Sequence, residues 1–198
     1  MDIPTDDEIR ALHEAHAPSE EAFDLVHTHC RIVCEIAERI MERTRFDGDA
    51  DLVRAGCLLH DIGVYRLAWT DGRPEETGYV RHGVLGHGLL DEAGFPEVLC
   101  RFCSRHVGVG ITRADVVEQR LPIPVDDYLP ESPEEELVMY ADKFHTKAEP
   151  PVFLTADSFA TRLRRRGEAK VARFRALVAR YGEPDLTGLA AEHGHPLA

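Results

Sequence analysis

The strongest constraint on the fold is a long amphipathic segment that follows Ser19, EEAFDLVHTHCRIVCEIAERIMERT. Its apolar positions recur at alternating steps of three and four, which is the spacing of side chains on one face of an α-helix. This stripe consists of Ala22, Val26, His29, Val33, Ile36 and Ile40. Such a face must be covered by other elements, and a histidine lies in its middle. The pattern therefore predicts a helical core that contains a buried imidazole.

The remaining pattern is helical almost throughout. Thr5 to Glu8 predicts a capping box that opens a short helix, and Ser132-Pro133 is a strong start signal for a later one. We expect further helices over about 50–62, 79–93, 96–106, 112–120, 132–147 and 156–181, with a loose tail at the end. The segment 70–78 predicts a turn-rich loop, and no convincing strand pair, internal repeat or linker is evident. The expected fold is a single all-α helical bundle.

Composition narrows the class of protein. Hydrophobic residues make up 43% and charged residues 30% of the 198 residues, as in an ordinary globular domain. No run approaches the roughly 18 apolar residues of a membrane span, and the start MDIPTDDEIR lacks the features of a signal peptide. Five cysteines, an odd number, favour free thiols in a reducing compartment. We therefore expect a cytoplasmic protein without a membrane partner.

The charge is negative and uneven. A net charge of −13 disfavours duplex nucleic acid, because contacts to phosphates need a positive face. Residues 161–180, however, carry eight Arg and Lys against one Glu, which leaves the rest of the chain near −20. The ordinary interpretation is a solvated helix face that packs on an acidic body. A rim that collects anions and a contact in a homodimer are the two alternatives.

A histidine and an aspartate, His60-Asp61, end the apolar run VRAGCLLHD. A buried aspartate without a partner costs about several kcal/mol, so a compensating group such as a divalent cation is expected. Other metal-binding residue types each come from a different predicted helix or helix end, which is how a helical bundle builds an internal metal centre. They are His29, His82, His106 and Asp142. Imidazole with carboxylate suits Fe, Mn, Co or Zn better than Ca.

In order and spacing these residues match the motif H…HD…D. His29, His60-Asp61 and Asp142, with their apolar neighbours, resemble the HD-domain superfamily of metal-dependent phosphohydrolases. The resemblance covers roughly residues 19–147. It implies that this segment is the HD domain, that residues 1–18 form an N-terminal helix, and that residues 148–198 form a helical extension packed on the domain.

Two further histidines specify the type of centre. His82 and His106 match the positions that binuclear HD proteins add to the motif. The resemblance therefore implies six ligands and two divalent transition metals, with Asp61 as the bridge. Fe and Mn are the first expectation, and Co, Ni, Zn and Mg are the alternatives.

The same resemblance implies hydrolysis of a phosphate ester of a small metabolite or nucleotide by a metal-activated hydroxide. Asp61 is then the central catalytic residue. Three cationic side chains near the motif are candidates for binding the substrate phosphate as well. They are Arg66, Arg105 and Lys143.

Departures from related groups limit the alternatives. HD-GYP phosphodiesterases carry HDxGK, whereas this chain has Val64 at the lysine position and no GYP motif follows, which argues against cyclic di-GMP. Mixed-valent diiron oxygenases of the superfamily supply a tyrosine and a glutamate before the first histidine, where this chain has Ser19 and Ala22. The oxygenase stays as the first alternative. A non-catalytic nucleotide-binding regulatory module is the second, although its hallmark, a missing ligand, is not found here.

Overall fold

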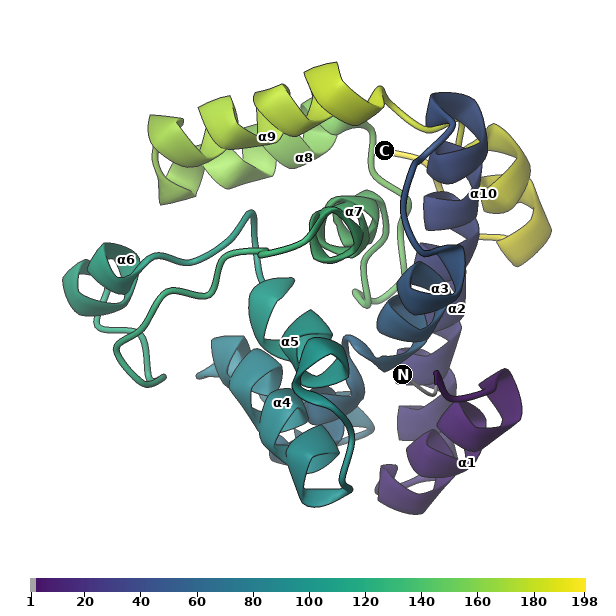
Figure 1. Ribbon diagram of the computed structural model, residues 1–198, viewed down its shortest axis with the longest axis vertical. Helices are drawn as coiled ribbons and strands as arrows, with labels where there is room; N and C mark the ends of the chain where they lie inside the picture. Colours follow the sequence, from purple (N-terminus) through teal and green to yellow (C-terminus); the bar gives the residue numbers. More distant parts are fainter. Residues whose placement is uncertain (1–2) are drawn as a thin grey trace.

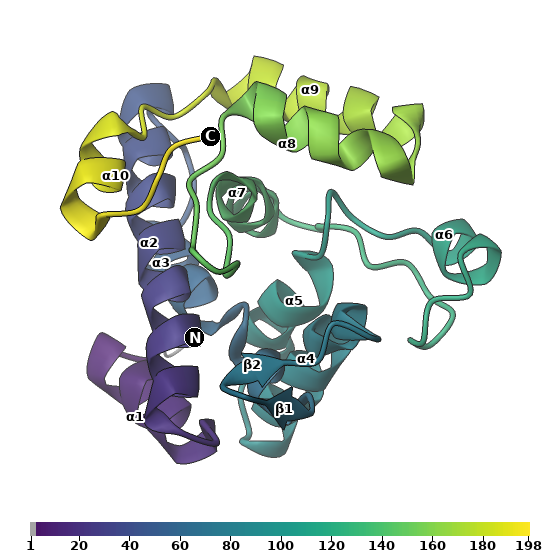
Figure 2. The ribbon, with the colours of Figure 1, turned by 180° about the vertical axis from the view of Figure 1, so that it is seen from behind.

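The computed structural model describes residues 3–198, and it confirms the all-α fold (Figures 1 and 2). Ten α-helices make up most of this part of the chain. They are α1 (Asp6–His16), α2 (Glu20–Thr44), α3 (Ala50–Leu59), α4 (His82–Glu92), α5 (Glu97–Arg105), α6 (Arg113–Glu118), α7 (Pro133–Ala141), α8 (Ala156–Leu163), α9 (Glu168–Tyr181) and α10 (Thr187–His193).

The core forms where α2, α3, α5 and α7 pack on one another. Figure 1 shows α7 nearly end-on in the middle of the molecule, with α8 and α9 on one side and α4 and α5 on the other. The hydroxyl of Ser19 caps α2 by accepting a hydrogen bond from the backbone of Ala22. The predicted stripe of α2 is buried along its whole length, and the imidazole of His29 is buried with it.

The N-terminal helix is attached through a buried imidazole. His13 of α1 is fully buried, with its Nε2 2.8 Å from the carbonyl oxygen of Leu58 and its Nδ1 2.9 Å from the hydroxyl of Tyr65. The neutral ring satisfies both bonds, because one nitrogen donates to the carbonyl and the other accepts from the phenol. Burial lowers the pKa of His13 to about 4.

This contact predicts a pH-dependent loss of stability. Above the unfolded pKa of 6.5 the ring is neutral in both states, so His13 adds no pH dependence there. As the pH falls from there towards 4, the unfolded chain binds the proton first, and the folded state loses up to about 3 kcal/mol. His13→Gln cannot bind this proton, so its stability should fall less steeply with acid than that of the wild type. Urea denaturation between about pH 7.5 and 4.5 measures the difference. His16→Gln is the matched control, and equal slopes for wild type and His13→Gln would contradict the assignment.

The structure corrects several predicted boundaries. The helix expected over 156–181 is divided, because the chain passes through a short 3-10 turn, Arg164–Arg166, and then through Gly167 at φ +103°, a conformation that favours glycine. The segment expected to be a loop contains a small antiparallel hairpin, β1 (Trp69–Thr70) and β2 (Arg73–Pro74). The helix expected over 132–147 ends as α7 at Ala141.

The tail is also more ordered than expected. It forms α10, and the following residues return to the body of the protein, where the carbonyl oxygen of Pro196 accepts a hydrogen bond from the backbone of Phe153 at 2.8 Å. Figure 2 shows α10 packed beside α2, with the C-terminus close to both. All five cysteines are buried and free. Within residues 3–198, no helix has the length and apolar character needed to cross a membrane.

Candidate metal centre

Six side chains converge between the helices, and the carboxylate of Asp61 lies at their centre. One carboxylate oxygen, Oδ1, is 3.4 Å from Nε2 of His82 and 3.5 Å from Nε2 of His106. The other oxygen, Oδ2, is 3.4 Å from Nε2 of His29 and 3.6 Å from Nε2 of His60. The two oxygens of one carboxylate thus face two different groups of histidines.

The sixth residue, Asp142, completes the first of these groups. Its Oδ1 lies 3.0 Å from Nε2 of His29 and 3.6 Å from Nε2 of His60. His29, His60 and Asp142 form one cluster of potential ligand atoms within 4.8 Å of one another, and His60, Asp61 and His106 form a second. The sequence predicted all six of these residues as ligands, and the structure brings them together in one place.

Helix ends place most of these side chains. His60 follows α3, His82 is the first residue of α4, and His106 and Asp142 directly follow α5 and α7. Only His29 lies inside a helix. Because several helix ends meet at one point, the side chains converge without a dedicated loop.

Backbone carbonyls orient three of the histidines. Nδ1 of His60 is 2.7 Å from the carbonyl oxygen of Cys57, and Nδ1 of His106 is 3.0 Å from that of Phe102. Nδ1 of His82 makes the same contact to Tyr79 at 2.5 Å. A carbonyl only accepts, so each Nδ1 carries the hydrogen and each Nε2 directs a lone pair into the centre. This tautomer is the one that a metal ligand requires.

The unsatisfied atoms of the centre fit a bound cation. Nε2 of His60 and Oδ1 of Asp61 are buried and have no hydrogen-bond partner in the described part of the chain. Leaving such atoms unpaired is costly, and native proteins rarely do so without a functional reason. The donor set of four imidazoles and two carboxylates suits divalent transition metals.

The electrostatic environment keeps Asp61, His29 and His82 in their metal-binding forms. Burial alone would raise the pKa of Asp61, but the ammonium of Lys147 and the imidazole of His60 hold that pKa well below its ordinary value. Burial lowers the pKa of His29 to about 4 and that of His82 to about 3. The carboxylate is therefore charged and these two imidazoles are neutral near neutral pH.

Lys147 is a residue of the centre that the sequence did not reveal. Its Nζ bonds to Oδ2 of Asp61, and only 14% of its side chain is exposed. Lys147 lies in the irregular segment after α7, where no helical spacing indicates its direction. The sequence indicates this residue only through its position shortly after Asp142.

The three cations predicted to bind the substrate phosphate contact other groups in this structure, and their role in binding phosphate stays a prediction. Lys143 is buried, with Nζ bonded to the carbonyl oxygen of His106 at 3.0 Å and to Asp142 at 2.5 Å. It therefore supports the ligand segments and does not line the cavity beside them. Arg66 pairs with Glu92 and Arg105 pairs with Glu131, and neither lines that cavity.

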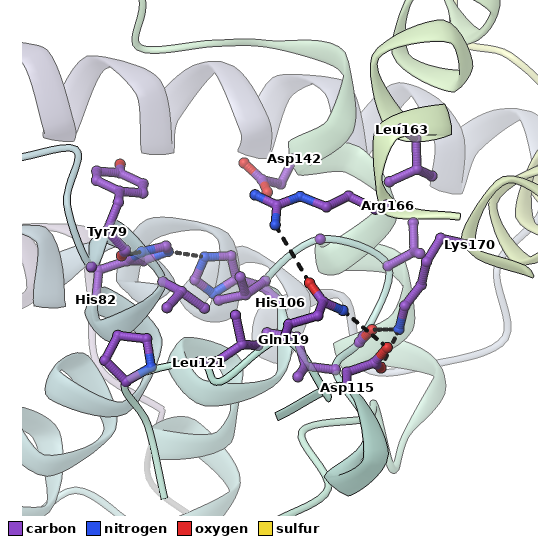
Figure 3. Close-up of a pocket in the computed structure, with 18 of the residues that line it drawn as sticks. Tyr79, His82, His106, Asp115, Gln119, Leu121, Asp142, Leu163, Arg166 and Lys170 are labelled. Carbon is purple, nitrogen blue, oxygen red and sulfur yellow. Dashed lines mark hydrogen bonds and ion pairs between the residues drawn. The ribbon is translucent and has the colours of Figure 1, made fainter. Parts of the chain in front are cut away.

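A cavity of about 490 Å³ opens from the centre. Figure 3 shows His82 and His106 at one side of it and Asp115 and Lys170 at the other, with the end of the Arg166 side chain beside Asp142 and in contact with Gln119. Its wall includes Tyr79, Leu121 and Leu163. This volume suits a small-molecule ligand of nucleotide size. A second cavity, of about 530 Å³, meets the centre at His29, and Lys147 lines both.

The C-terminal tail also reaches the centre. Nδ1 of His29 is 2.9 Å from Nδ1 of His145, and Nε2 of His145 is 3.0 Å from Nδ1 of His195. These contacts correct the prediction of a loose tail: His195 joins the chain of three rings, and His193 bonds to Glu35 at 2.8 Å. His195 thereby fixes the orientation of His145, which in turn orients His29.

Removal of this support should weaken metal binding without unfolding the protein. His195→Ala leaves His145 free to turn, so we expect about tenfold weaker binding of cobalt at the His29 side of the centre. His193→Ala is the matched control, because His193 lies on the same tail and contacts Glu35 instead. Competition with a chelator measures both affinities. Unchanged cobalt affinity in His195→Ala would show that the tail has no such role.

Comparison with known proteins identifies the family. The family model for the HD domain matches residues 26–147. An uncharacterised protein of Methanocaldococcus jannaschii is 40% identical over 124 residues, which are 60% of this chain and 66% of that protein. A tRNA (cytidine(56)-2'-O)-methyltransferase of Picrophilus torridus is 36% identical over 124 residues, which are 63% of this chain but only 32% of that enzyme. The chain thus spans just under two thirds of the first relative and about a third of the second.

Solved structures agree on the fold. The HD domain of the L. monocytogenes phosphodiesterase PgpH, in complex with cyclic-di-AMP, superposes with a TM-score of 0.54 at 16% identity. This likeness covers 91% of the present chain and 89% of the PgpH chain. A second structure of the PgpH HD domain gives a TM-score of 0.53 at 18% identity. Because the family match covers more than half of the sequence, this chain belongs to the HD-domain family.

Proposed function

We propose that this protein is a metal-dependent phosphohydrolase that cleaves a phosphate ester of a small metabolite or nucleotide. The observation that carries the proposal is the position of Asp61, whose two carboxylate oxygens face two separate groups of ligands beside an open cavity. Two divalent cations held by these residues would lower the pKa of a water molecule and would neutralise charge on a phosphoryl group.

In this proposal the six ligands divide into two groups, one for each cation. Oδ2 of Asp61 with His29, His60 and Asp142 would hold one cation. Oδ1 of Asp61 with His82 and His106 would hold the other. The second group has fewer protein ligands and lies on the wall of the 490 Å³ cavity, so the substrate would approach from this side.

The protein's own residues supply binding and orientation. The backbone carbonyls keep Nε2 of His60, His82 and His106 directed at the centre. Lys147 adds a positive charge next to Asp61 on the cavity wall, where it can attract the phosphate. Burial of these groups keeps bulk water out of the centre, which strengthens their electrostatic effect.

The shape and charge of the cavity set the class of substrate. A volume of about 490 Å³ suits a small molecule, and the net charge of −13 opposes long nucleic acids. The structurally similar HD domain of PgpH was crystallised with cyclic-di-AMP. That ligand is a small phosphorylated compound, which is the class of substrate that we propose. We also propose that the extension 148–198 is part of the functional unit, because it lines this cavity.

A screen of small phosphate monoesters and diesters tests the proposal. The purified protein is loaded with Mn, Co or Fe, and phosphate release is measured with and without oxygen. We expect turnover of at least one compound in the absence of oxygen, because hydrolysis needs only water. Product formation that requires both iron and oxygen would replace the hydrolase with the oxygenase alternative.

A further inference from the structure

The wall of the cavity opposite the metal ligands comes from two segments that are far apart in the sequence. Leu163, Arg166 and Lys170 belong to the C-terminal extension, outside the matched residues 26–147. They face the segment around α6, which contributes Gln119 and Leu121. Figure 3 shows these side chains directed towards one another across the cavity.

The two cations on this wall differ in their partners. Nζ of Lys170 bonds to the carboxylate of Asp115 at 2.5 Å and to the carbonyl oxygen of Gly110 at 2.8 Å, so its charge is compensated. The guanidinium of Arg166 makes one long contact, 3.5 Å from Nη1 to Oε1 of Gln119. Among residues 3–198 no carboxylate lies within ion-pair distance of Arg166.

The position of this uncompensated guanidinium is informative. In Figure 3 its side chain extends over the cavity, and the guanidinium lies between Asp142 and Gln119, above His106. An arginine in this place meets an anion that enters from the cavity, with its planar fork of donors directed at the anion's oxygens. The opposite side of the same anion would face the metal ligands.

Apolar side chains also line the cavity, beside the polar side chains of Glu76, Gln119 and Lys147. Val107, Val109, Leu121, Pro122 and Leu163 line the cavity between the ligands and the extension. An organic group of ring size would bury its faces against these side chains, and release of water from both surfaces favours this contact. The wall therefore suits a phosphate ester with an apolar body better than one with a short alkyl group.

We propose that Arg166 binds the phosphate group of the substrate, and that the substrate is a phosphate ester with a ring-sized apolar body. This inference rests on the proposed function, because it concerns the same cavity. It assigns part of the basic segment 161–180 to anion binding and gives the C-terminal extension a role in substrate choice. The HD domain then supplies the metal ligands, and the extension supplies a contact that determines specificity.

The test uses benzylphosphonate, whose carbon–phosphorus bond is not hydrolysed, and methylphosphonate for comparison. Binding to the manganese-loaded protein of 198 residues is measured by calorimetry. We expect benzylphosphonate to bind about tenfold more tightly than methylphosphonate. Arg166→Ala should weaken benzylphosphonate binding about tenfold to hundredfold, and Arg166→Lys should recover part of the loss. Arg165→Ala is the matched control, because Arg165 is exposed like Arg166 but does not line the cavity; the affinity of this variant should stay within about twofold of the wild type.

The outcomes separate this inference from the proposed function. Equal affinity of wild type and Arg166→Ala overturns the role of Arg166, even if the protein hydrolyses phosphate esters. If the manganese-loaded wild type does not bind benzylphosphonate, the role of Arg166 is overturned as well. If it binds benzylphosphonate no more tightly than methylphosphonate, the inference that the substrate has an apolar body is overturned. Binding that depends on Arg166 without hydrolysis of any ester supports the anion site and contradicts the phosphohydrolase.

Discussion

Asp61→Ala is expected to remove bound metal from both sides of the centre. The reason is geometric, because Oδ2 faces His29 and His60 while Oδ1 faces His82 and His106. Loss of a bridge affects two sites, whereas loss of a terminal ligand affects one. We expect the metal content to fall from about two per chain to near zero in Asp61→Ala, and to about one in His82→Ala or His106→Ala.

Metal analysis after dialysis against manganese or iron, under anaerobic conditions, gives these stoichiometries. Asp51→Ala is the control, because Asp51 lies on α3, the helix that ends just before His60-Asp61, and 80% of its side chain is exposed. It should retain the wild-type content. Two metals bound to Asp61→Ala would contradict the bridging role, and a wild type that saturates at one metal would contradict the binuclear centre.

Lys147→Met should destabilise the metal-free protein strongly and the loaded protein much less. Without metal, Lys147 is the ammonium that compensates the buried carboxylate of Asp61. Removal of one partner of a buried ion pair typically costs about 3–5 kcal/mol, because the remaining charge is left uncompensated. Bound cations next to Asp61 would replace that compensation. The mutant should also bind metal more tightly, since a competing positive charge is gone.

Denaturation of the mutant and the wild type with and without manganese measures both effects. Lys170→Met serves as the comparison, because Lys170 pairs with Asp115 away from the metal ligands and both side chains are partly exposed. Lys170→Met should lose less stability than Lys147→Met, and this loss should be the same with and without manganese. The same loss of stability in Lys147→Met with and without metal would show that Lys147 does not compensate Asp61.

Local patterns in the sequence predicted the helical fold and the six candidate ligands. The stripe of α2 sets its buried face by helical spacing alone, and His29 lies on it. His60, His82 and His106 stand at helix ends that capping and glycine signals locate to within a few residues. The helix that ends before Asp142 is predicted too long, over 132–147. The resemblance to the family motif predicts that these helix ends meet at one site, which helical spacing alone does not predict.

The remaining parts of the site depend on contacts between distant segments. Arg166 reaches the cavity because the chain turns at Gly167 between α8 and α9, and the surrounding residues have ordinary helical propensity. His195 meets His145 only after the tail has folded back onto Phe153. Lys147 follows α7 in an irregular segment. No local periodicity indicates such contacts. The sequence therefore predicts phosphate binding by cations that lie close to the motif along the chain, such as Lys143.

The most direct test of the proposed function traces the oxygen atom that enters the product. A phosphate ester identified as a substrate is incubated with the manganese-loaded protein in water labelled with oxygen-18, without molecular oxygen. We predict that the released phosphate contains one labelled oxygen from water, as metal-assisted hydrolysis at phosphorus requires. No product without molecular oxygen, or label that comes from molecular oxygen and not from water, would contradict the phosphohydrolase.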